Sequence, residues 1–80
     1  MTQTNIQQTI TNILIEAGIS QKAITLKASL VKDLGLDSLD IAELIMEMEC
    51  VFNVDIPMLE AEQLTTVDEA VNYISKRINF

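Results

Sequence analysis

Histidine and tryptophan are absent from this sequence of 80 residues, and cysteine occurs once, as Cys50. Without histidine the chain has no Ser-His-Asp triad, no Cys-His pair and no histidine-based metal site. A single cysteine closes no internal disulfide, and within a helical pattern Cys50 is typical of a small packed apolar side chain. The acids Asp33, Asp37 and Asp40 do not follow the alternating spacing of an EF-hand loop. We therefore expect neither enzyme activity nor a bound metal ion.

The chain also lacks a long apolar run and a basic leader. No apolar run approaches the roughly 18 residues that a membrane-spanning helix needs. The first residues, "MTQTNIQQTI", have neither the basic region nor the apolar core of a signal peptide. We expect a cytoplasmic protein that does not insert into a membrane.

Basic residues are few, and they are unevenly distributed. Twelve acids against five bases give a net charge of −7, and no Lys or Arg lies between Asp33 and Ser75. Nucleic acid would require a basic surface to meet its phosphates, so we expect no such partner. A charged protein that docks on the middle of the chain should carry a basic patch.

Apolar residues at helical spacing dominate what the sequence does contain. They make up 49% of the chain, with only two Gly and one Pro, and no repeat or low-complexity segment is present. This composition is typical of one small domain, residues 1–80, held together by hydrophobic packing alone. The periodicity predicts an all-α fold with longer helices at about 2–17, 38–52 and 66–78.

The two outer helices have clear end signals. The first carries apolar residues at spacings of three and four and ends at Gly18; these residues are Ile6, Ile10, Ile13, Leu14 and Ala17. The last opens on the T-x-x-E capping box of Thr66 and Glu69 and has Lys76 and Arg77 in its final turn, where the dipole favours positive charge. Its apolar positions are Val67, Ala70, Val71, Ile74 and Ile78.

Two connecting segments are also predicted. Residues 18–37 show no sustained period, but their scattered apolar side chains indicate a long loop that packs on the core and includes a short helical turn. Pro57 cannot continue the middle helix, and a short helix is expected at about 59–64.

The middle helix has three distinguishable faces. At 100° per residue, one arc forms the predicted core stripe: Ile41, Leu44, Ile45, Met48 and Phe52. Asp40, Glu43 and Glu47 form an acidic row that the pattern places opposite the core. Leu39, Ala42 and Met46 form a second apolar strip that the core stripe does not require. Such a strip, edged by carboxylates, indicates a docking surface; the alternative is that the bundle buries this helix more deeply.

Ser38 stands where this helix begins. If Asp37 is the N-cap, Ser38 occupies the first helical position, with its hydroxyl exposed beside unpaired N–H groups and the positive end of the dipole. A phosphate ester there would lie in a favourable field. Ser38 has no neighbouring base that would make it a nucleophile, so the residues themselves indicate a site for an anion or a modification.

The stretch "DLGLDSLDIAELIMEMECVFNVDIP", residues 33–57, resembles the signature of acyl carrier proteins, in which an Asp-Ser-Leu triplet opens the second helix. The similarity continues through "LTTVDEAVNYI" and covers the C-terminal half of the chain, whereas the first helix matches only in length and amphipathicity. The resemblance implies a small acyl-carrier-like four-helix bundle with the helices and long loop given above. It also implies a carrier protein and not an enzyme.

By this resemblance Ser38 carries 4′-phosphopantetheine, attached through a phosphodiester by a phosphopantetheinyl transferase that uses coenzyme A and recognises Asp37. The thiol of that arm, and not Cys50, would hold acyl groups as thioesters. The implied partners are the transferase, ketosynthases and other acyl-processing enzymes with basic docking patches, and the free carrier would be a monomer. The residues implied in partner binding are Leu39, Asp40, Ala42, Glu43, Met46, Glu47, Met58 and Leu59.

The chain departs from housekeeping fatty-acid carriers at positions that are often acidic in them. Met58 and Leu59 follow Pro57, and Cys50 and Val51 lie in the last turn of the middle helix. This more apolar edge favours a specialised type II carrier of a polyketide or fatty-acid-like pathway. A housekeeping fatty-acid carrier and an amino-acyl carrier are the alternatives, and an unmodified acidic helical interaction module is the rival from another class.

Overall fold

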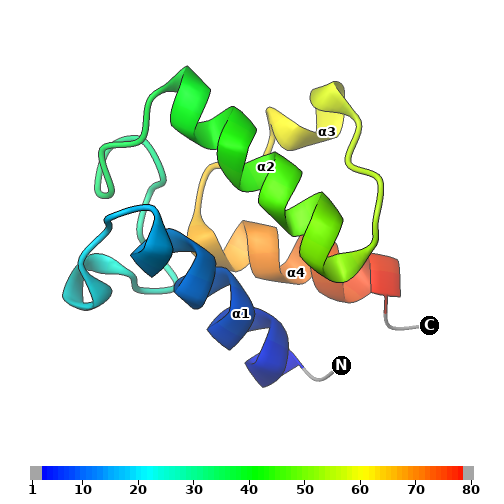
Figure 1. Cartoon of the computed structure of the whole chain (residues 1–80), viewed down its shortest axis with the longest axis horizontal. Helices are drawn as coiled ribbons and strands as arrows, with labels where there is room; N and C mark the ends of the chain where they lie inside the picture. The colour runs from blue at the N-terminus through cyan, green and yellow to red at the C-terminus, as the bar shows by residue number, and fades with distance from the viewer. Residues whose placement is uncertain (1–2, 79–80) are drawn as a thin grey trace.

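A computed structural model describes residues 3–78 of the chain, which fold into four α-helices and one short 3-10 turn (Figure 1). The helices are α1 (Gln3–Glu16), α2 (Ser38–Phe52), α3 (Met58–Ala61) and α4 (Val67–Ile78), and the turn is η1 (Gln21–Ala23). The predicted all-α bundle with three longer helices is therefore confirmed. Thr2, where the first helix was predicted to begin, lies outside the described residues.

Two predicted helix ends need correction. Ala17 was predicted on the buried stripe of the first helix, but it is exposed because α1 ends at Glu16 and the chain turns at Gly18, whose φ is +99°. The short helix was predicted at 59–64 and occupies Met58–Ala61. Its last turn tightens, since the N–H groups of Gln63 and Leu64 donate to carbonyls three residues back. The chain then extends, and Leu64 is buried.

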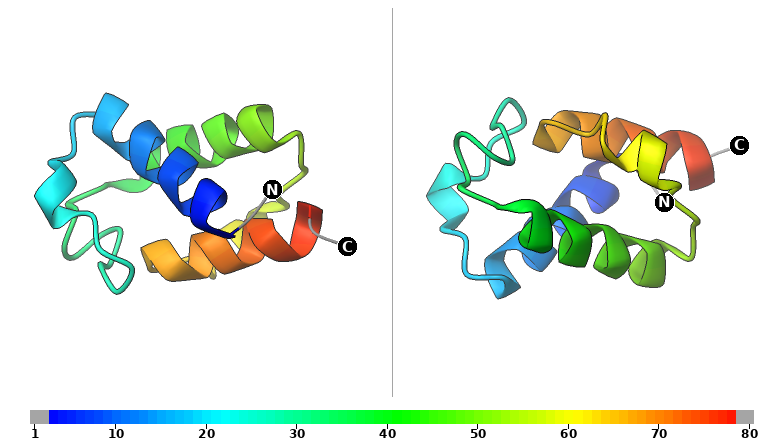
Figure 2. Two further views of the ribbon diagram at one scale, coloured as in Figure 1. Left: turned by 90° about the horizontal axis from the view of Figure 1, so that it is seen from below. Right: turned by 90° about the horizontal axis from the view of Figure 1, so that it is seen from above.

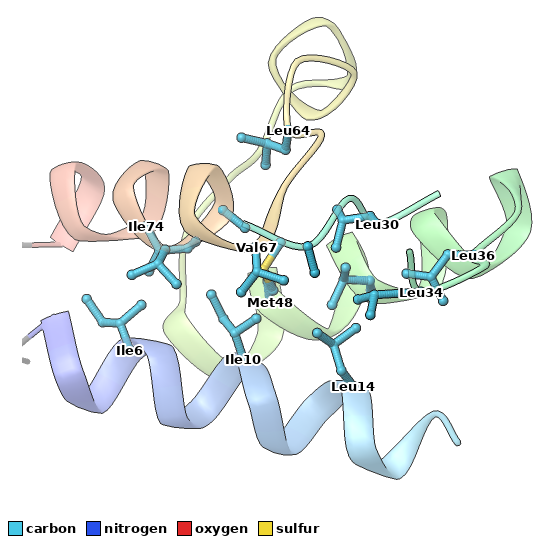
Figure 3. Close-up of a cluster of buried hydrophobic side chains, with 14 of the residues drawn as sticks. Ile6, Ile10, Leu14, Leu30, Leu34, Leu36, Met48, Leu64, Val67 and Ile74 are labelled. Carbon is cyan, nitrogen blue, oxygen red and sulfur yellow. The ribbon is translucent and has the colours of Figure 1, made fainter. Parts of the chain in front are cut away.

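The core is a single apolar cluster to which every long helix contributes (Figure 3). α1 provides Ile6, Ile10 and Leu14, and α4 provides Val67, Ala70, Val71 and Ile74. From α2, Leu44, Met48 and Phe52 are buried as predicted, whereas Ile41 and Ile45 are only partly buried. Ile41 lies in the first turn of α2, and Ile45 lies at the edge of the predicted arc. Hydrophobic packing is thus concentrated on one side of α2.

The long loop packs on the core as predicted, and it does so through both side chains and backbone. Ala28, Leu30, Leu34 and Leu36 are buried. Ser29 forms an isolated antiparallel bridge with Thr66, and the N–H of Leu30 donates to the Thr65 carbonyl at 2.9 Å. The loop carbonyls of Leu26 and Ala28 in turn accept from the first N–H groups of α4. These bonds satisfy donors that would otherwise be unpaired at a helix start.

The start of α4 confirms the predicted capping box. The N–H of Glu69 donates to Thr66 Oγ1 at 3.3 Å, and the N–H of Thr66 donates to Glu69 Oε1 at 3.1 Å. The hydroxyl and N–H of Thr65 also donate to the Glu69 carboxylate, which lowers the pKa of Glu69. The pKa of Asp68 is lowered by the Thr66 hydroxyl and, to a smaller extent, by Lys27, which lies 3.6 Å away.

The helices are arranged so that the start of α2 lies away from the start of α1 and the end of α4. α1 packs against both α4 and α2, and α3 lies beside α4 (Figures 1 and 2). The long loop crosses the end of the bundle next to the start of α2. Among residues 3–78, none of the helices has the length and apolar character needed to cross a membrane.

Met48 and Met46 provide a matched test of this core. Met48 is 0% exposed and Met46 is 66% exposed on the same helix. We expect Met48→Ala to lower the free energy of unfolding by about 2–5 kcal/mol, because it leaves a cavity. Met46→Ala should change it by less than about 0.5 kcal/mol. Urea denaturation followed by circular dichroism measures both, and equal losses would contradict this assignment of faces.

Candidate functional site

The chain reaches the start of α2 through a turn that requires glycine. The N–H of Leu36 donates to the Leu30 carbonyl at 3.0 Å, and the N–H of Gly35 donates to the Val31 carbonyl at 3.1 Å. These bonds reach back six and four residues and close a turn in which Gly35 has a left-handed φ of +73°, a conformation that glycine adopts without strain. The turn buries Leu34 and Leu36 on either side of Gly35. The next residue, Asp37, is thereby held at the surface.

Asp37 caps α2, as predicted. The N–H of Asp40 donates to Asp37 Oδ1 at 2.9 Å, and the N–H of Asp37 donates to Asp40 Oδ2 at 3.2 Å. This reciprocal pair is a capping box built from two aspartates. It leaves Ser38 at the first helical position and exposed. The cap that a serine often supplies is therefore provided by its neighbour, and the Ser38 side chain is not needed for it.

The second apolar strip of α2 is exposed. Leu39 is 67% and Met46 66% exposed, and Ala42 between them is exposed as well. The alternative that the bundle buries this strip is therefore wrong. The strip lies on the side of α2 turned away from Leu44, Met48 and Phe52, which face the core.

The acidic row lies in a different place from the one predicted. Asp40, Glu43 and Glu47 do not lie opposite the core; they lie on the flank of α2 that faces α1. There they line an open cleft of about 560 Å³, with Ile13 and Glu16 contributed by α1. The apolar strip occupies the position opposite the core because it lies about half a turn from the buried stripe.

Cys50 also needs correction. It was predicted to be a packed apolar side chain, but it is exposed and lines the same cleft between α1 and α2. It lies on the same flank of α2 as Glu43 and Glu47, away from the core side chains. The contribution of Glu16 to this cleft was missed by the sequence analysis, because only the packing of α1 on α2 brings it near the acidic row.

Two further residues that were predicted for partner binding lie on α3. Met58 and Leu59 are 76% and 77% exposed. The segment that leads into α3 is joined to α2, since the N–H of Ile56 donates to Glu49 Oε2 at 2.9 Å. All eight residues predicted for partner binding are therefore exposed, six of them on α2 and two on α3.

Comparison with known proteins decides the family. The family model described as "Phosphopantetheine attachment site" matches residues 8–74, which include α2, α3 and most of α1 and α4. An acyl carrier protein of Amoebophilus asiaticus (strain 5a2) is 43% identical over 74 residues, which cover 91% of this chain and 92% of the relative. The chain belongs to the acyl carrier protein family. This assignment decides against the unmodified interaction module.

Membership also settles the cofactor and the kind of activity. Carriers of this family hold 4′-phosphopantetheine covalently and are not enzymes, so 4′-phosphopantetheine is the cofactor of this carrier. The start of α2 suits such a group, since an exposed hydroxyl lies at the positive end of a 15-residue helix. A phosphodiester carries a negative charge, which the first N–H groups and the dipole of α2 stabilise.

Proposed function

We propose that Ser38 carries the 4′-phosphopantetheine arm and that the carrier shuttles acyl groups on it between partner enzymes. The observation that carries this proposal is the division of roles at the start of α2. Asp37 and Asp40 each accept the backbone N–H of the other, and Ser38 lies exposed at the first helical position without serving as the cap. A transferase can reach such a hydroxyl without unfolding the helix.

The residues around Ser38 have separate tasks in this proposal. The first N–H groups of α2 stabilise the phosphodiester, and Asp37 both fixes the helix start and offers a carboxylate for recognition by the transferase. When bound, the arm supplies a thiol that forms thioesters with acyl groups. The protein itself supplies no base at Ser38, so the transferase provides the chemistry of attachment.

Partner enzymes are proposed to dock on α2 and α3. The exposed strip of Leu39, Ala42 and Met46 runs beside carboxylates, and Met58 and Leu59 extend the apolar area onto α3. The absence of Lys and Arg between Asp33 and Ser75 favours partners with basic patches, among them the transferase and ketosynthases. Exposed ion pairs are individually weak, so such complexes form and dissociate quickly.

The exposed apolar side chains at the end of α2 and on α3 support a specialised pathway. Val51, Met58 and Leu59 are 50%, 76% and 77% exposed, so apolar side chains stand where an acidic carrier would present charge. We infer a type II polyketide or fatty-acid-like pathway, with a housekeeping fatty-acid carrier and an amino-acyl carrier as the alternatives. We further infer a cytoplasmic, monomeric carrier in which residues 1–80 form one domain, and the one apolar cluster and the net charge of −7 support this.

Loading by a transferase tests the site. Incubation of the apo protein with coenzyme A, Mg²⁺ and a promiscuous phosphopantetheinyl transferase should add the mass of one phosphopantetheine group. Ser38→Ala should abolish that gain while circular dichroism stays nearly unchanged, since Asp37 still caps α2. Ser20→Ala is the control, because Ser20 is exposed and makes no side-chain cap bond. Loading of the Ser38→Ala variant would contradict the assignment.

Charge reversal tests the docking surface. Glu43→Lys and Glu47→Lys should each slow loading several-fold at low salt, because they place a cation against a basic partner. Glu62→Lys makes the same change in net charge at an exposed position just beyond α3 and serves as the control. Raising the salt concentration should shrink the difference. Equal rates for all three variants would rule out docking on the acidic row.

The acyl group that the carrier holds in its native host tests the proposed pathway. Intact-mass analysis of the carrier purified from its native host should reveal the acyl group on the arm. We expect a polyketide-like or modified acyl chain. Straight saturated chains alone would favour the housekeeping alternative, and an amino acid would favour the amino-acyl alternative.

A further inference from the structure

α3 is too short to be stable by itself. It comprises four residues, Met58–Ala61, whereas isolated helices shorter than about 12 residues are marginal in water. Ile56 before it and Leu64 after it are buried and fix its two ends. Between these anchors, the position of α3 depends on what its own side chains contact.

Glu60 makes the contact that joins α3 to α4. Its Oε1 accepts a hydrogen bond from the Tyr73 hydroxyl and another from the Arg77 guanidinium. Tyr73 and Arg77 are one helical turn apart on α4, and the guanidinium carbon lies 4.9 Å from the centre of the Tyr73 ring. One carboxylate on α3 is thus held by two side chains of α4, which lies beside it (Figure 2).

These contacts shift the pKa values of Glu60 and Tyr73. The pKa of Glu60 is lowered, first because the Tyr73 hydroxyl donates to it and then because Arg77 does. The pKa of Tyr73 is raised, first by burial and then by the hydrogen bond to Glu60. Hydrogen bonds to an ionised carboxylate are stronger than those between neutral groups. The side chains of Arg77 and Glu60 are 38% and 43% exposed, so water still screens their attraction.

The other side of α3 carries Met58 and Leu59. These side chains are more than three-quarters exposed, whereas Glu60 and Ala61 are partly buried. In so short a helix, the position of Glu60 also determines the direction in which the Met58 and Leu59 side chains project. A small, partly buried contact therefore controls the orientation of the apolar pair.

We propose that Glu60, Tyr73 and Arg77 are positioning residues, which clamp α3 against α4 and so set the orientation of Met58 and Leu59 toward partner enzymes. The clamp itself does not depend on the proposed function. Its role in docking does rest on that proposal, because Met58 and Leu59 are assigned to partner binding there.

The mobility of α3 in the free protein tests the clamp. ¹⁵N NMR relaxation of the unchanged protein should give order parameters of about 0.85 for Leu59, Glu60 and Ala61, the value of a rigid backbone. Tyr73→Phe removes the hydroxyl donor and Arg77→Gln removes the charged guanidinium, and each should lower these values toward about 0.6. Arg77→Lys keeps a cation and should restore part of the order. Unchanged order parameters in both Tyr73→Phe and Arg77→Gln would overturn the clamp.

Glu62→Gln is the matched control for these variants. Glu62 is exposed immediately after α3, and its replacement by Gln removes a carboxylate of the same type as that of Glu60. It should leave the order parameters of residues 59–61 unchanged. A loss of order as large as that of Tyr73→Phe would show that any change near α3 loosens it and would overturn the specific role of Glu60.

Kinetics of loading by the transferase test the positioning role. Arg77→Gln should raise the KM for the apo carrier several-fold with kcat unchanged. The melting temperature of the variant should stay well above the assay temperature, so that unfolding does not explain the rise in KM. In a Met58→Ser, Leu59→Ser background the further effect of Arg77→Gln should vanish, because no apolar pair is left to position. An undiminished effect in that background would overturn the positioning role.

The same experiment separates the two proposals. If Met58→Ser with Leu59→Ser leaves KM unchanged, the docking role proposed for these residues is wrong, and the positioning role falls with it. The relaxation measurements then still decide whether the clamp exists. If the double variant raises KM but Arg77→Gln does not, docking stands and the positioning role is overturned.

Discussion

The reciprocal hydrogen bonds between Asp37 and Asp40 are the interaction on which the start of α2, and with it the proposed attachment site, depends. Each aspartate accepts the backbone N–H of the other, so Ser38 stands at the first helical position without serving as the cap. Gly35 makes this possible, because its left-handed backbone turns the buried loop outward just before Asp37. A helix start, a dipole and an exposed hydroxyl therefore coincide at one position.

The core then determines what the rest of α2 presents to a partner. Leu44, Met48 and Phe52 are held against α1 and α4, which fixes the rotation of α2 about its own axis. Once that rotation is fixed, the apolar strip must face outward and the acidic row must border α1. The proposed docking surface is thus a consequence of packing on the opposite side of the helix, and its carboxylates lie beside a cleft instead of forming a separate face.

Short-range signals were sufficient to predict the helices and the start of α2 from sequence. The cap at Asp37, the capping box of Thr66 and Glu69, and the exposure of Leu39 and Met46 follow from residues within one or two turns of each other. Contacts between distant segments were not predictable in this way. Glu60 meets Tyr73 and Arg77 across 13 and 17 residues, and the cleft with Cys50 and Glu16 depends on how α1 crosses α2. No local spacing encodes either arrangement.

The most direct test of the account is to locate the arm on the loaded protein. Trypsin should release residues 33–76 as one peptide, which holds both Ser38 and Ser75, so its fragment ions must distinguish them. If Ser38 carries the arm, every fragment containing Ser38, and none lacking it, retains phosphopantetheine or the mark of its loss. Phosphopantetheine on Ser75 or on a threonine of this peptide would contradict it.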